Sequence, residues 1–70
     1  MEDYRIILIN PEGDDSCSLD VLGSSLERCK STAEMYLAMN QGRYKKAIIM
    51  SRWKQMWRQA IPAIDFTLNL

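Results

Sequence analysis

The segment Arg43–Arg58, RYKKAIIMSRWKQMWR, concentrates the side chains of this 70-residue chain that could bind an anion. It contains six of the nine basic residues and both tryptophans, and it contains no acidic residue. Lysine and arginine neutralise phosphates, and flat aromatic rings stack on unpaired bases. This composition makes the segment the strongest candidate for a binding function.

The spacing of the tryptophans qualifies that hypothesis. On a helix, Trp53 and Trp57 would share one apolar face and point away from the cations. Tryptophan on an apolar helical stripe is more often part of a core than a platform for bases. We therefore interpret the tryptophans as core and the cations, with one tyrosine, as the outward contact surface. The predicted partner-binding residues are Arg43, Tyr44, Lys45, Lys46, Arg52, Lys54 and Arg58.

Catalytic and metal-binding equipment is sparse. The chain has no histidine to act as a base near neutral pH. Ser24 and Ser25 have no nucleophile-elbow spacing, and a helix-capping role accounts for them. The spacing of Glu12, Asp14 and Asp15 matches no calcium-binding loop, so we interpret them as a solvated turn. The sequence predicts no enzyme, no cofactor and no metal site.

The two cysteines, Cys17 and Cys29, do not have the spacing of a CxxC motif. Without histidine, a zinc site would lack its other soft ligands. We interpret both cysteines as small buried apolar groups and not as a bridge.

The charge of the chain is zero overall but divided along its length. Residues 1–40 carry −5 and residues 41–70 carry +5. Such asymmetry suggests either recognition of a polar partner or two halves that face each other, and the sequence does not separate these. Because the domain has no excess of positive charge, strong binding to nucleic acid is disfavoured.

The first half of the chain carries clear local signals. Tyr4–Ile9 is a continuous apolar run that predicts a buried, central strand, and the turn residues after it end the strand. Alternation in Ser16–Leu22 predicts a returning hairpin strand, although helical spacing also continues through it. Residues 24–40 are predicted to be a helix that begins with a Ser24–Glu27 capping box and stops at Gly42. Met35 and Met39 would lie opposite its apolar face.

The second half is more ambiguous. Within Arg43–Ser51, the run Ala47–Met50 predicts a third strand. From Ser51 to Ile61 the apolar residues recur at helical spacing, with Pro62 as a stop, which predicts a second helix. A rival interpretation makes residues 44–61 one long helix. Clean alternation in Ile64–Leu70 predicts a half-buried strand at a sheet edge.

These elements predict a single compact α+β domain spanning residues 1–70. Its order would be β-β-α-β-α-β, with a small, mostly antiparallel sheet and two helices packed on one face. No apolar run is long enough to span a membrane, and the N-terminus lacks the basic residues of a secretion signal. We therefore expect a cytoplasmic, intracellular protein.

The function that uses most of these features is a non-enzymatic interaction module that binds and modulates another macromolecule, most economically a protein. Tryptophan, methionine and arginine are enriched at the centres of interfaces. The small size suits an accessory regulator or inhibitor of the kind that viruses and mobile elements encode. The alternative is a nucleic-acid-binding domain that uses the basic face of residues 43–58. A third hypothesis is a structural homodimer through the C-terminal edge strand or the Met35/Met39 face.

Overall fold

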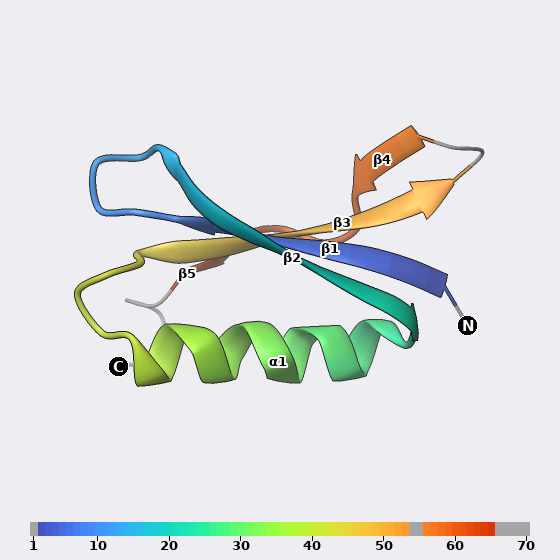
Figure 1. Ribbon diagram of the computed structural model, residues 1–70, viewed down its shortest axis with the longest axis horizontal. Coiled ribbons are helices and arrows are strands. Elements are labelled where there is room, and N and C mark those ends of the chain that lie inside the picture. The colour runs from blue at the N-terminus through green and yellow to red at the C-terminus, as the bar shows by residue number, and fades with distance from the viewer. Residues whose placement is uncertain (1, 54–55, 66–70) are drawn as a thin grey trace.

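The computed structural model describes residues 2–53 and 56–65, which form one antiparallel sheet with one helix (Figure 1). The elements in chain order are β1 (Glu2–Ile9), β2 (Asp15–Ser24), α1 (Leu26–Met39), β3 (Lys46–Trp53), β4 (Met56–Gln59) and β5 (Ile64–Asp65). Strands lie in the order β2-β1-β3-β4, and β5 pairs with the other end of β3 from β4.

The strand β1 occupies a central position in the sheet, as the apolar run Tyr4–Ile9 predicts. It pairs antiparallel with β2 on one side and with β3 on the other. Alternate side chains of β1, Tyr4, Ile6 and Leu8, are buried. They face α1, which lies along one face of the sheet (Figure 1). The core between the sheet and α1 also contains Cys29, Ala33 and Leu37 of the helix. The strand β3 contributes Ala47 and Ile49 to the same core.

The turn between β1 and β2 is organised by the residues that the sequence singled out. The Asn10 side-chain oxygen accepts a hydrogen bond from the Asp14 amide at 2.9 Å, and the Asn10 carbonyl accepts one from the Gly13 amide at 2.9 Å. Gly13 has a φ of 93°, a conformation that favours glycine. The asparagine therefore substitutes for backbone partners within the turn.

The helix α1 forms where the sequence predicts it, with one change at its start. The N-cap is Ser25, whose hydroxyl accepts a hydrogen bond from the Arg28 amide at 3.2 Å. Ser24, the predicted cap, is instead buried at the end of β2, and its hydroxyl has no hydrogen-bond partner among the described residues. Gly42 follows the helix with a φ of 86°, in agreement with the predicted stop.

The predicted second helix is wrong. The fold is β-β-α-β-β with the short β5 added, and residues 51–53 and 56–59 belong to β3 and β4. The reason lies in pairing with β1, which continues through Met50 and Ser51 and carries β3 past the predicted helix start. β4 then folds back beside β3, with Arg52 opposite Trp57. The rival single helix over residues 44–61 is wrong for the same reason.

The C-terminal strand is described only at its beginning. Ile64 pairs with Ala47, and Asp65 pairs with Lys46. The rest of the predicted strand Ile64–Leu70 lies outside the described residues. The strand β2 forms the edge of the sheet on the side away from β4 and β5, an edge that was not predicted.

Candidate functional site

The sheet has a second face, on the side away from α1, which we call the outer face. Because successive side chains of a strand point to opposite sides, the neighbours of the buried Ile6 and Leu8 in β1 point away from the helix. The strand register places residues of β3 and β4 beside them. The outer face is defined by these residues: Arg5, Ile7, Lys46, Ile48, Met50, Arg52 and Trp57.

A row of charged and aromatic side chains crosses the outer face from β2 to β4. The Arg5 Nε donates to the Asp20 carboxylate at 2.7 Å, and the Arg5 guanidinium lies 4.3 Å from the centre of the Trp57 ring. The Arg52 guanidinium lies 5.9 Å from the same ring centre. Two cations thus lie against one half-buried indole, an arrangement stabilised by attraction to the ring's negative face.

The ion pair also favours the charged forms of both side chains. Its hydrogen bond to Arg5 lowers the pKa of the Asp20 carboxyl, and the same contact raises the pKa of Arg5. The two side chains are 47% and 35% exposed, so water screens the pair and its contribution to stability is small. Its main effect is to orient the guanidinium over Trp57.

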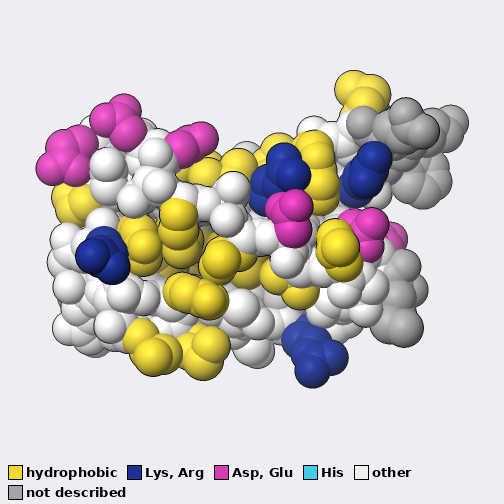
Figure 2. All heavy atoms as spheres, viewed as in Figure 1, with side chains coloured by type: hydrophobic (Ala, Val, Ile, Leu, Met, Phe, Trp, Pro, Cys, Tyr) yellow, Lys and Arg dark blue, Asp and Glu magenta, His cyan; other side chains and the backbone are white. Residues whose placement is uncertain are grey.

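An apolar strip lies beside the row. Ile7, Ile48 and Met50 point to the outer face and are only half-buried. Among the described residues, no helix covers this side of the sheet (Figure 1). Figure 2 shows basic and acidic side chains next to each other at the β4 end of the molecule. The outer face therefore combines arginine, tryptophan and partly exposed aliphatic groups.

The structure separates several of the residues that the sequence grouped as one contact surface. Arg43, Tyr44 and Lys45 lie in the connection between α1 and β3. Lys46 begins β3, on the same side as Ile48.

Arg52 and Arg58 point to opposite faces, because Arg58 lies opposite Ser51 and Arg52 lies opposite Trp57. Lys54 lies outside the described residues. Only Arg52 and Lys46 of the seven predicted residues are therefore placed on the outer face.

The assignment of Trp57 to the core is wrong. The indole does not reach the core between the sheet and α1; it lies on the outer face beneath Arg5. In the predicted helix, Trp57 and Arg52 would point to opposite faces. In the observed sheet, strand pairing puts these two residues directly opposite each other. Side chains directly opposite each other on neighbouring antiparallel strands lie close together, so strand pairing brings Arg52 and Trp57 into contact.

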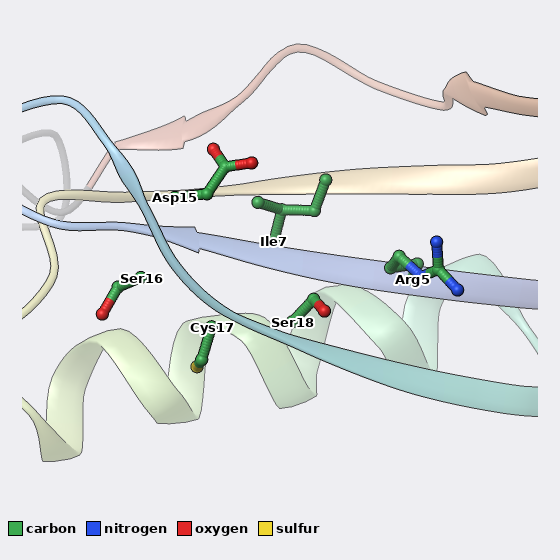
Figure 3. Close-up of a pocket in the computed structure, with 6 residues that line it drawn as sticks. All are labelled: Arg5, Ile7, Asp15, Ser16, Cys17 and Ser18. Carbon is green, nitrogen blue, oxygen red and sulfur yellow. The ribbon is translucent and has the colours of Figure 1, made fainter.

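A shallow pocket of about 380 Å³ opens where the outer face meets β2 (Figure 3). Asp15, Ile7 and Arg5 rise from the sheet on the side away from α1, while the Cys17 sulfur points toward the helix. Cys17 is exposed, which corrects the expectation that both cysteines are buried; Cys29 is fully buried, and both are free thiols. The Cys17 sulfur lies 3.6 Å from the Tyr44 hydroxyl, whose pKa this contact raises.

Within residues 2–53 and 56–65, no group of three acidic, cysteine or histidine side chains is placed to hold a metal ion. In the same part of the chain, no helix is both long and apolar enough to cross a membrane.

Sequence reasoning missed Arg5, Ile7 and Asp20. One signal was present: Arg5 is the single charge inside the apolar run YRIILI, and a charge in a central strand needs a partner. Nothing in the sequence indicated that this partner would be Asp20, fifteen residues away.

Comparison with protein-family models, with curated proteins and with solved structures found no significant match to this chain.

Proposed function

We propose that this protein is a non-enzymatic interaction module that binds and modulates another protein through the outer face of its sheet. The observation that carries the proposal is the position of Arg5 and Arg52 against Trp57, beside a half-buried apolar strip. Arginine, tryptophan and methionine are the residue types enriched at the centres of protein interfaces.

The chemistry of the face indicates what a partner segment would carry. Arg52 is exposed and Lys46 is half-buried on this side, whereas the carboxylate of Asp20 is already paired with Arg5. A partner with acidic groups flanking apolar side chains would satisfy the cations and cover Ile48 and Met50. Binding of this protein would block that segment of the partner from other contacts, and the partner would be regulated in this way.

The nucleic-acid alternative receives less support. Stacking of bases needs an open aromatic face, but Trp57 is half-buried and has a guanidinium at 4.3 Å. The arginines of the β3–β4 hairpin are divided between the two sides of the sheet. A nucleic-acid backbone that lies along one face of the sheet would therefore contact only some of the basic residues predicted in residues 43–58.

The test compares two charge reversals in the same hairpin. Arg52→Glu alters the outer face, and Arg58→Glu makes the same change in charge on the opposite side. Proteins captured from the native host by the immobilised wild-type chain should be lost with Arg52→Glu and retained with Arg58→Glu. Equal capture by all three chains would refute the outer face as the binding surface.

A second measurement addresses the alternative. Fluorescence anisotropy with a labelled single-stranded oligonucleotide should show no binding in the micromolar range. Binding that weakens steeply as salt rises from about 50 to 200 mM would replace the protein-binding proposal with the nucleic-acid one.

A further inference from the structure

The edge strand β2 offers a second interaction surface, separate from the outer face. It is ten residues long, and among the described residues it pairs only with β1. Most of its side chains are exposed. A long edge strand with unpaired backbone groups is a template for another strand.

The hydrogen-bond pattern identifies which residues of β2 present those groups. The Ala60 amide donates to the Ile49 carbonyl at 2.8 Å, so Ile49 directs its backbone groups toward β4. In antiparallel sheets this direction alternates along each strand. Ile48 and Met50 therefore bond to β1 through Ile7 and Arg5.

The same alternation continues into β2. The backbone amides and carbonyls of alternate β1 residues point toward β2, in the pairs Tyr4 with Val21, Ile6 with Leu19 and Leu8 with Cys17. The regular pairing covers Cys17–Val21 and is bounded by a β-bulge at each end, so the amides and carbonyls left at the free edge in this stretch are those of Ser18 and Asp20.

We infer that this protein forms a homodimer in which the β2 strands of two copies pair antiparallel about a two-fold axis at Leu19, joining the two sheets into one. In this register Ser18 of each copy lies opposite Asp20 of the other, and each pair exchanges both backbone hydrogen bonds. The inference is independent of the proposed function, because the outer face stays open on both copies.

Charge disfavours one of the neighbouring registers. A shift that centres the axis on Asp20 would place two carboxylates directly opposite each other, which is destabilising. With the axis at Leu19, each Asp20 keeps Arg5 of its own chain and faces an uncharged serine.

The side chains at the edge are also self-complementary. Leu19 points to the same side as Ile6 and is half-buried, as is Val21. Across the two-fold axis, Leu19 would meet its own copy, and Val21 would meet Cys17. Figure 2 shows hydrophobic side chains gathered over β2 and α1 on this side of the molecule.

Further apolar groups on these two elements are Leu22, Met35 and Met39, which are 67%, 52% and 75% exposed. The exposed methionines lie on the Met35/Met39 face, which with the C-terminal strand was the dimer contact predicted from the sequence. A second copy at β2 would pair the free edge of the sheet instead, with Leu22 on the same strand.

The first test measures mass and amide exchange. Sedimentation should show a shift from monomer to dimer as concentration rises, and the amides of Ser18 and Asp20 should become protected in the dimer. A monomer at all concentrations up to about 1 mM, where an association of about 4 kcal/mol would be visible, would overturn the inference.

The second test fixes the register by cross-linking. In a Cys17→Ser background, Leu19→Cys should form an intermolecular disulfide, because residues opposite each other in a non-hydrogen-bonded pair lie about 4.5 Å apart at Cα, within disulfide range. Leu22→Cys, in the same background, is the control, since it would lie opposite Ser16. Equal cross-linking of the two variants would mean random collision and would overturn the register.

Two disruptive variants complete the experiment. Ser18→Pro removes an amide that points to the free edge and spares the hydrogen bonds to β1. Ser18→Asp keeps the backbone and sets a carboxylate opposite Asp20. Each should remain folded and sediment as a monomer; if Ser18→Pro does not fold, Ser18→Asp decides. A folded Ser18→Asp variant that dimerises as well as the wild type would contradict the inference.

Discussion

At the scale of single residues, Arg5 connects the two ends of the sheet. Because side chains alternate along β1, Arg5 points away from the buried face. It donates a hydrogen bond to Asp20 on β2, and its guanidinium lies over the Trp57 ring on β4. A lysine would keep the charge but lose the planar group that satisfies both neighbours. Arginine therefore serves here as a planar spacer between a carboxylate and an indole.

The Arg5–Asp20 contact makes stability depend on pH in a defined direction. Because the pKa of Asp20 is lowered in the folded protein, the pair stabilises the fold at pH values above the ordinary aspartate pKa of about 3.9. That contribution is lost as the pH falls through the lowered value. Asp20→Asn should therefore be less stable than wild type at pH 7, and the difference should narrow toward pH 2 in urea unfolding. A difference that stays constant over this range would contradict the assignment.

The two cysteines should differ in reactivity. Cys17 is exposed, whereas Cys29 is fully buried and its burial raises the pKa of its thiol. Because the thiolate is the reactive form, a thiol reagent should label Cys17 rapidly and Cys29 only after unfolding. Mass spectrometry of the native protein should show one rapid adduct per chain. Cys17→Ser is the control, and rapid labelling of that variant would show that Cys29 is accessible.

At the scale of elements, the parts with strong local signals were predictable. The apolar run of β1, the turn at Asn10 and the helix α1 each follow from residues within a few positions of one another. The segment from Ser51 onward was not predictable in this way, because its apolar spacing fits a helix as well as a hairpin. Pairing with β1, which is distant in sequence, decided between the two.

The start of α1 gives a prediction that separates two adjacent serines. Ser25→Ala removes the hydroxyl that accepts from the Arg28 amide, so it should lower the free energy of unfolding by about 1 kcal/mol. Ser24→Ala removes a buried hydroxyl that has no hydrogen-bond partner within the part of the chain that the structure describes, so it should be neutral or stabilising. Thermal or urea unfolding of the two variants measures this. A larger loss of unfolding free energy in Ser24→Ala than in Ser25→Ala would show that Ser24 is the N-cap.

At the scale of the whole molecule, the acidic and basic halves share one sheet. The strands β1 and β2 come from the acidic half, and β3 and β4 come from the basic half. Across the outer face, the contacts that join them are the packing of Arg5 on Trp57 and the apolar strip. The sequence showed the division of charge but not the contact surface, since the relevant pairs come from strands far apart in the chain.

Stability should be unevenly distributed over this sheet. β1 is hydrogen-bonded on both sides and contributes Tyr4, Ile6 and Leu8 to the core. β4 has only four residues, and three of them, Met56, Arg58 and Gln59, are exposed. Trp57 is therefore the principal side chain that holds β4 against the sheet, and β4 is expected to open more easily than β1.

Trp57→Ala should release β4 while leaving the centre of the sheet in place. Loss of the half-buried indole and its cation–π contacts should cost about 1–2 kcal/mol, which corresponds to roughly tenfold faster amide exchange. Exchange measured by mass spectrometry should accelerate in a peptide covering residues 56–59 and stay unchanged in residues 2–9. Met56→Ala, an exposed neighbour in the same strand, is the control and should alter neither peptide. Equal acceleration of both peptides would mean that β4 and β1 unfold as one unit, and that Trp57 stabilises the whole sheet.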